Sequence, residues 1–295
     1  RIPQDVFSSV VTGHPSAITC LSKIIVDRLK SRPFAEKRDE LASSAVKRSG
    51  DPYGLQLRTE SLMKLLIINC GSSSLKYNLF DTADESRNAR GLVERIGESG
   101  TRHLHRTVKG ERAWRLPLGG HREAFAATVQ ALTDSDSGVL SSPKEVTAVG
   151  HRVVHGGDKY SHAIVITEDV LAEIEEAASL APLHNPVNLV GIREAMRLFP
   201  EVPHVAVFDT AFHQTMAPYA YLYGLPYEHY ERMRIRRYGF HGTSHAYVSL
   251  KVAEFLKRPY NELETIVCHL GNGASICAVD HGRSCLLYTS DAADE

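Results

Sequence analysis

The chain has 295 residues, of which 43% are hydrophobic and 23% charged, so it holds enough apolar material for two globular cores. A formal net charge of -1 excludes an overall basic field that would attract nucleic acid or an anionic membrane. No apolar run reaches the roughly 18 residues of a membrane span, and we expect a cytoplasmic protein. The five cysteines form no zinc-type spacing, which fits thiols in a reducing compartment.

The first predicted strand begins directly after Met63, the first methionine of the chain. Residues 1–62 mix a helix-like stretch with loop-like flanks and carry no chemical motif. We therefore expect 1–62 to be a non-native or disordered extension. The alternative is a genuine N-terminal extension or transit peptide, but acidic residues such as Asp27 and Glu36 argue against transit.

Short apolar runs then alternate with amphipathic segments, which predicts an α/β fold. In chain order we expect strands at Leu65–Ile68, Tyr77–Phe80, Val146–Val149, Val205–Phe208, Thr265–Cys268 and Ile276–Val279. The expected helices are His121–Leu132, Glu168–Leu180, Val187–Leu198 and His245–Leu256. Asn185, followed by Pro186, is the expected N-cap of the third helix, and Thr243 or Ser244 that of the fourth. The final segment, 285–295, follows without turn chemistry and is expected to be a non-native tail.

Polar side chains stand where four of these strands end. Asn69 follows the first, His151 and Arg152 the third, Asp209 the fourth and His269 the fifth. Ligands of α/β sheets bind beyond the carboxyl ends of the strands, so these residues are candidates for a site.

Two segments share one plan, "LLIINCGSSSLKYNLF" and "ETIVCHLGNGASICAV": an apolar strand, a polar residue, a spacer, a glycine, a small polar turn and a second strand. Small residues around Gly71 and Gly273 would let a phosphate approach backbone N–H groups. Two such hairpins suggest two related domains that clamp one polyphosphate. The alternative is a pair of ordinary strand connections. Neither a P-loop nor a dinucleotide-binding glycine motif occurs.

Six motifs occur in order: "NCGSSSLK", "GHRVVHGG", "PLHNP", "VFDTAFH", "RRYGFHGTSH" and "CHLGNGASICAVDHGRS". Together they resemble the acetate kinase family over residues 63 to about 284. The resemblance implies the superfamily of acetate and sugar kinases, heat-shock chaperones and actin, with two ribonuclease H-like domains and ATP in the cleft. It places the first domain at 63–210 and the incomplete start of a second at 211–284.

The resemblance also implies an activity, the reversible transfer of the ATP γ-phosphoryl group to acetate, giving acetyl phosphate and ADP. Acetate, acetyl phosphate and ATP/ADP would be the partners, with Mg2+ or Mn2+ as cofactor and a homodimer as the assembly. Family members continue beyond "GRS" with further nucleotide and metal residues. We therefore expect this chain to be an inactive fragment.

Three residues receive catalytic roles from the resemblance. Arg152 would bind the acceptor and steady the transition state, because a guanidinium holds a carboxylate or phosphoryl group in bidentate fashion. His241 precedes a helix start, where an anion is favoured, and would stabilise the moving phosphoryl group. Asp209, with Asn69, would hold the metal.

The binding residues implied by the resemblance fall into two groups. The acceptor methyl would lie among Val154, Leu183 and Phe240. The nucleotide and its phosphates would contact Asn69, Ser72, Ser74, Lys76, His184, His269, Gly271, Asn272 and Gly273. A solvent-facing strand lysine is the alternative for Lys76, and structural histidines are the alternative for His184 and His269.

Three other functions are alternatives to acetate kinase. A propionate kinase of the same family differs by one methylene in its substrate. A non-catalytic clamp like actin would bind ATP without forming acyl phosphate, but has no need of a carboxylate site. The arginines between Arg232 and Arg237 suggest RNA, yet apolar residues interleave with them, and a solvated strand or loop edge explains them better.

Overall fold

The computed structural model describes residues 63–82, 86–117, 119–271 and 273–289. The expected extension 1–62 and residues 290–295 of the expected tail lie outside these ranges. Within them, no helix combines the length and the apolar character that a membrane crossing needs.

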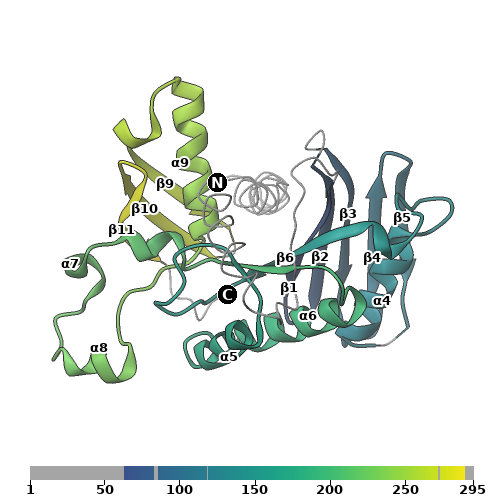
Figure 1. Ribbon diagram of the computed structural model, residues 1–295, viewed down its shortest axis with the longest axis horizontal. Helices are drawn as coiled ribbons and strands as arrows, with labels where there is room; N and C mark the ends of the chain where they lie inside the picture. Colours follow the sequence, from purple (N-terminus) through teal and green to yellow (C-terminus); the bar gives the residue numbers. More distant parts are fainter. Residues whose placement is uncertain (1–62, 83–85, 118, 272, 290–295) are drawn as a thin grey trace, which may run out of the picture.

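Most of the described chain belongs to one mixed sheet with helices packed on it (Figure 1). The strand order is β5-β4-β3-β2-β1-β6-β8-β7, and β1, β6 and β8 run parallel. The strands are β1 Lys64–Cys70, β2 Ser74–Asp81, β3 Arg87–Glu94, β4 Arg102–Thr107, β5 Gly110–Arg115, β6 Val146–Val153, β7 Ile164–Val165 and β8 His204–Phe208. The carboxyl ends of the three parallel strands therefore meet at one edge of the sheet.

Both faces of the central strands are buried. Leu66 and Ile68 of β1 pack with residues of helices α4 (His121–Leu132) and α6 (Asn185–Leu198). Their neighbours Leu65 and Ile67 point to the opposite face, where they pack with Val205 and Val207. Helix α5 (Glu168–Glu176) is capped by Thr167, whose hydroxyl accepts a hydrogen bond from Val170 N–H.

The chain from residue 211 onward builds a second, smaller unit. It contains helices α7 Pro218–Tyr221, α8 Glu228–Met233 and α9 Gly242–Leu256, and strands β9 Glu264–Leu270, β10 Ala274–Asp280 and β11 Arg283–Thr289. These strands form an antiparallel sheet in the order β11-β10-β9. Short 3-10 helices lie at Pro143–Glu145, Ala177–Ser179, Phe212–Thr215 and Tyr260–Glu262. In Figure 1 this unit lies on the opposite side of the molecule from β4 and β5.

The three-stranded sheet is buried on one face only. Val267, Cys277 and Leu287 form a small core with Met216. The alternate residues Ile266 and Tyr288 face outward and are 74% and 63% exposed. The outward face of this sheet therefore exposes apolar side chains among the described residues.

Each strand and helix predicted from the sequence is present; helix α4 has the predicted ends, and the other elements differ at one or both ends. Two predicted caps are wrong. Helix α6 begins at Asn185 with His184 as its cap, because the Asn185 side chain is buried and bonded to other segments. Helix α9 begins at Gly242, because His241 adopts a left-handed conformation with φ of 57° and Gly242 N–H donates to Asp209 O.

Strands β3, β4, β5, β7 and β11 were not predicted. Strand β11 crosses the boundary expected at residue 284, after a tight turn with positive φ at His281 and Gly282. Its Leu287 side chain is 1% exposed, and its carbonyl accepts a hydrogen bond from Arg237. Residues 285–289 are thus an integral part of the second sheet.

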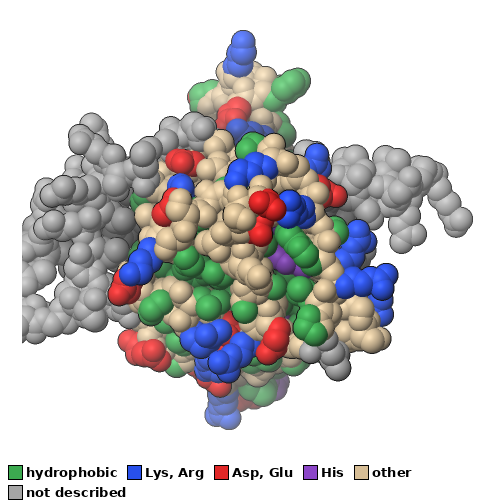
Figure 2. Space-filling view, turned by 90° about the vertical axis from the view of Figure 1, so that its right-hand side faces the viewer, with side chains coloured by type: hydrophobic (Ala, Val, Ile, Leu, Met, Phe, Trp, Pro, Cys, Tyr) green, Lys and Arg blue, Asp and Glu red, His purple; other side chains and the backbone are tan. Residues whose placement is uncertain are grey.

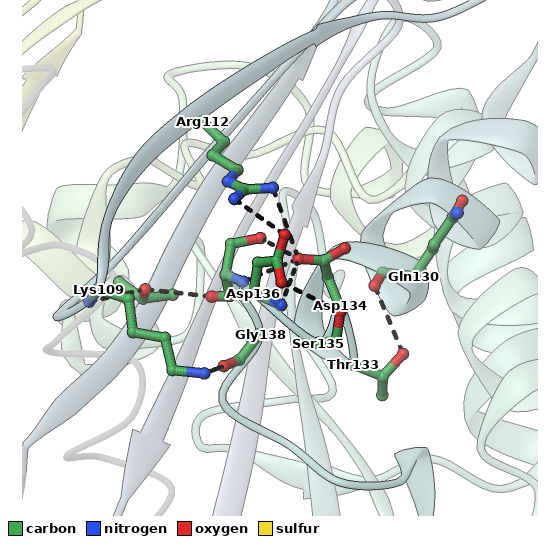
Figure 3. A network of polar contacts seen from close by, with 10 residues as sticks. Lys109, Arg112, Gln130, Thr133, Asp134, Ser135, Asp136 and Gly138 are labelled. Atoms are coloured by element: carbon green, nitrogen blue, oxygen red, sulfur yellow. Dashed lines mark hydrogen bonds and ion pairs between the residues drawn. The ribbon is translucent and has the colours of Figure 1, made fainter.

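Polar contacts anchor the hairpin β4–β5 to the loop after α4 (Figure 3). Arg112 forms ion pairs with Asp136 at 3.2 Å and Asp134 at 3.9 Å, in the loop after α4. Lys109 Nζ donates to the Gly138 carbonyl at 2.8 Å. Figure 2 shows the neighbouring side of the molecule, where acidic and basic side chains are scattered together.

Candidate active site

Polar residues of the parallel strands meet at the carboxyl edge of the large sheet. Asn69 is the second-last residue of β1, Arg152 the second-last of β6, and Asp209 follows β8 directly. His151, the neighbour of Arg152, points the other way into the protein, with its Nε2 2.9 Å from Nδ1 of the buried His204. The sequence predicted that His151 and Arg152 would both lie at the edge, but only Arg152 contacts Asp209 there.

Arg152 and Asp209 form a bidentate ion pair at this edge. Arg152 Nε lies 3.1 Å from both carboxylate oxygens of Asp209, and Arg152 Nη2 lies 2.5 Å from Oδ2. The Asp209 side chain is 3% exposed and that of Arg152 is 30% exposed. Such a pair fixes the plane of the guanidinium at the edge of the sheet.

Lys76 adds a second cation. It lies on β2 opposite Asn69 in the antiparallel register. Burial, and secondly the charge of Arg152, lower the pKa of Lys76. Two neighbouring cations are typical of an anion site, and the Lys76 side chain is half-buried. A phosphate contact by Lys76 stays a prediction.

Two histidines bring the second unit to this edge. The His241 ring stacks on His269 of β9, with centroids 4.1 Å apart and an interplanar angle of 16°. The hydrogen bond from Gly242 N–H to Asp209 O, 2.9 Å long, ties His241 to the end of β8. Ser244 Oγ lies 2.9 Å from His269 Nδ1. The end of β8, the start of α9 and strand β9 are thereby linked to one another.

His213 was quoted in a motif but given no role by the sequence. Its side chain is 0% exposed; Nε2 donates to Phe240 O at 3.0 Å, and Nδ1 lies 2.8 Å from Ser284 Oγ. Burial lowers its pKa to about 4. His213 therefore holds the backbone just before His241. The spacing "AFH" carries no signal for such a role, because the contact depends on tertiary packing.

The residues expected around the acceptor methyl are not equally enclosed. Val154 is 5% exposed, and the half-buried Phe240 ring lies edge-on to His155 with centroids 5.8 Å apart. Leu183 is 62% exposed. Two of the three expected walls are thus packed into the protein, and the third is open to solvent.

Helix α6 holds the loop after Arg152 through two buried asparagines. Val154 N–H donates to Asn188 Oδ1, and Asn188 Nδ2 donates to Cys70 O, at 3.0 and 2.9 Å. His155 N–H donates to Asn185 Oδ1 at 3.0 Å, and Asn185 Nδ2 donates to the His155 carbonyl at 2.9 Å. His184, half-buried, caps this helix. The motif "PLHNP" therefore positions strand ends as well as offering a histidine.

Both predicted hairpins are present. Gly71 N–H donates to Ser74 O at 2.8 Å, and Gly271 N–H donates to Gly273 O at 2.9 Å. Ser72 is exposed and Ser74 half-buried. The His121 side chain at the start of α4 donates to Gly71 O at 2.8 Å, a contact that the sequence did not indicate. Asn272 lies outside the described residues.

Asp209 and Asn69 suit a divalent cation chemically. Carboxylate and amide oxygens are hard ligands of the kind that Mg2+ and Mn2+ accept. An ionised carboxylate offers about four lone-pair positions, and Arg152 uses three hydrogen bonds on Asp209. One lone-pair position on Asp209 is thus not used by Arg152, and a metal ion or one of its bound waters could take it.

Comparison with known proteins decides the family. A family model described as the acetokinase family matches residues 64–290. The chain belongs to the acetokinase family. An acetate kinase of Clostridium acetobutylicum is 52% identical over 223 residues, which make up 75% of this chain and 55% of that protein. The chain thus spans about half the length of the curated relatives that it matches.

Two solved structures share the fold. The acetate kinase of Porphyromonas gingivalis has a TM-score of 0.72 at 41% identity, covering 77% of this chain and 57% of that one. A propionate kinase from Francisella tularensis has a TM-score of 0.72 at 39% identity, covering 78% and 58%. The expected α/β fold, ribonuclease H-like as in actin-like ATPases, is confirmed by these matches, with only part of the second domain in this chain.

Proposed function

We propose that the protein to which this acetokinase-family chain belongs is an acetate kinase. The observation that carries this proposal is the meeting of the Arg152–Asp209 ion pair with Lys76 and the stacked His241 and His269. Cations and imidazoles gathered at the carboxyl edge of the sheet suit a reaction between two anions. Family membership and 52% identity to an acetate kinase support the same assignment.

In the proposed reaction a carboxylate oxygen of acetate attacks the γ-phosphorus of ATP. The bond from that phosphorus to the β,γ-bridging oxygen breaks, which gives acetyl phosphate and ADP. Arg152 holds the acetate carboxylate and neutralises charge on the moving phosphoryl group, and His241 donates a hydrogen bond to that group. Asp209 keeps the Arg152 guanidinium in place.

Nucleotide contacts are proposed for the two hairpins. Asn69, Ser72, Ser74 and Lys76 would meet the phosphates on one side, and His184, His269, Gly271, Asn272 and Gly273 the nucleotide on the other. Asn69 and Asp209 would hold Mg2+ or Mn2+, which supplies positive charge to the phosphate oxygens when bound. A homodimer and a cytoplasmic location stay predictions.

The size of the acceptor is a second question. Val154, Leu183 and Phe240 are the proposed walls around the acceptor methyl. The similarity to a propionate kinase, with the same TM-score as the acetate kinase, makes propionate the alternative substrate. One methylene is worth only about 1–3 kcal/mol, so the ratio of kcat/KM for acetate and propionate decides between them.

The proposal is tested with a hydroxamate assay for acetyl phosphate on a protein in which this chain is extended to the length of its relatives. We expect ATP-dependent product from the wild type and none above background from Arg152→Ala. The matched control is Arg193→Ala, an exposed arginine paired with Glu175. ATP binding without acyl phosphate in the wild type would contradict the proposal and favour an actin-like clamp.

A further inference from the structure

Ser275 joins the proposed catalytic histidine to a second, fully buried histidine. Its Oγ lies 2.9 Å from His241 Nδ1 and 2.7 Å from His245 Nε2. Ser275 is 2% exposed and His245 is 0% exposed. The three residues come from the cap of α9, its first turn and strand β10, so the fold itself builds this chain of contacts.

The direction of the two hydrogen bonds follows from the other ring nitrogen of His245, Nδ1. Among the described residues, the hydrogen bonds of Ser275 Oγ are to these two rings. If Ser275 accepted from both rings, its own buried proton would have no acceptor, so it donates to one ring and accepts from the other. Within the described residues, His245 Nδ1 has no hydrogen-bond partner. A buried N–H group without an acceptor is rarer in proteins than an under-satisfied acceptor. The proton of His245 therefore belongs on Nε2, from which it is donated to Ser275 Oγ.

His245 is held in its neutral form. Burial first, and then the charges of His213, His241 and His269, lower its pKa to about 3. A neutral ring with its proton on Nε2 leaves Nδ1 bare. The Ser275 hydroxyl, having accepted from His245, must donate to His241 Nδ1.

His241 then carries its own proton on Nε2. We propose that His245 and Ser275 are positioning residues that hold His241 as the Nε2–H tautomer, with that N–H group as the donor to the transferring phosphoryl group. That the acceptor is a phosphoryl group rests on the proposed function. The assignment of the tautomer rests on the hydrogen-bond geometry alone. The opposite tautomer would present a lone pair to the phosphoryl oxygens and repel them.

The orientation of the His241 ring is restricted from three sides. His269 stacks on its face at 4.1 Å, Ser275 bonds its Nδ1, and the left-handed backbone at φ 57° sets the direction of Cβ. His269 is in turn bonded to Ser244 at 2.9 Å. A hydrogen-bond donor fixed in this way is preorganised, which is how such groups stabilise a developing charge.

The deciding measurement is 15N NMR of the Arg1–Glu295 chain labelled at histidine, at about pH 8, where exposed imidazoles are neutral. Resonances are assigned by comparison with His241→Gln and His245→Gln. We expect a protonated, pyrrole-type Nε2 and a pyridine-type Nδ1 for both histidines. A pyrrole-type Nδ1 in His241 would overturn the proposal. This readout needs no substrate, and the two variants serve only to assign resonances of the wild-type chain.

Ser275→Ala then tests the consequence, in the protein extended to the length of its relatives. We expect His241 to become a tautomer mixture and kcat to fall about 10- to 100-fold, with the KM values for acetate and ATP within about twofold. The matched control is Ser249→Ala, a buried serine of α9 whose hydroxyl bonds the His245 carbonyl and the Tyr260 hydroxyl, neither of which belongs to a histidine ring.

The two proposals fail in different ways. An inactive wild type with the expected NMR spectrum contradicts the proposed function and supports the tautomer assignment. An active Ser275→Ala with unchanged kcat and an unchanged His241 spectrum overturns the positioning role and leaves the proposed function standing.

Discussion

Arg152 is the residue on which both stability and the proposed chemistry depend. Its partner Asp209 is 3% exposed on the side chain, and a buried carboxylate without its cation is costly. Removing one partner of a buried ion pair destabilises a protein by about 3–5 kcal/mol. Because Arg152 is partly open to solvent, the lower end of that range applies here. Variants of Arg152 must therefore be checked for folding before their kinetics are interpreted.

The first prediction is that Arg152→Ala lowers kcat by about 10³ or more in the protein extended to the length of its relatives. Arg152→Lys should recover little, because an ammonium group cannot keep both the Asp209 contact and a bidentate hold on the substrate. Steady-state kinetics with the hydroxamate assay measure this. Near-normal turnover of the lysine variant would contradict the assigned role.

The second prediction concerns Gly239, two residues before His241. Its φ is 96°, and an added Cβ would lie 2.0 Å from Leu287 Cδ2. Gly239→Ala should destabilise the second unit by at least about 1–3 kcal/mol from backbone strain alone. Gly224→Ala, where nothing lies within 4 Å of the added carbon, is the control. Equal urea midpoints for the two variants would show that Leu287 does not pack there.

At the scale of elements, helix α6 acts as a clamp on two strands of the large sheet. Asn185 and Asn188 lie one turn apart, and both side chains are buried. Asn188 bonds the end of β1 at Cys70 and the exit from β6 at Val154. The strand ends that carry Asn69 and Arg152 are thus held at a set separation by one side chain.

The third prediction is that Asn188→Ala destabilises the chain by about 2–6 kcal/mol, since two buried backbone groups lose their partner at about 1–3 kcal/mol each. Equilibrium unfolding in urea measures the change. Arg197→Ala, on the exposed side of the same helix, should stay within about 0.5 kcal/mol. A loss below about 1 kcal/mol for Asn188→Ala would mean that water replaces the amide.

At the scale of the whole molecule, buried histidines are spread over both units. In the described chain the buried histidines whose pKa is lowered, mainly by burial, are His103, His105, His151, His155, His204, His213 and His245. For His103, His155 and His213 the lowered pKa is about 4. The fold therefore keeps these rings neutral at a pH where the unfolded chain would protonate them.

The fourth prediction follows from the sign of these shifts. Below pH 6.5 the unfolded state binds protons that the folded state does not, so stability falls as the pH drops from about 6.5 toward about 4. Each such histidine contributes a slope of up to about 1.4 kcal/mol per pH unit. Thermal unfolding between pH 7 and 5 measures the slope. A Tm that does not fall over this range would contradict the neutral buried rings.

The sequence was enough for the parts of the structure that follow from local pattern. Apolar runs such as "LLII" and "VAVF" predicted the central strands, because a strand buried on both faces reads as a continuous hydrophobic stretch. Polar strands such as β5, "GERAWR", gave no such signal, since an edge strand is held by its partner and not by its own composition.

The candidate site divides in the same way. Arg152, Asp209, Lys76, His241 and His269 were named from motifs and strand ends, and the structure brings them together. Asn188, His213 and the Ser275 bridge to His245 were found only in three dimensions, because each makes its contact with a segment remote in the sequence. Residue type and spacing predict which groups can do chemistry. Which way a ring is turned, and which nitrogen carries its proton, depends on side chains that only the folded chain brings within hydrogen-bonding distance.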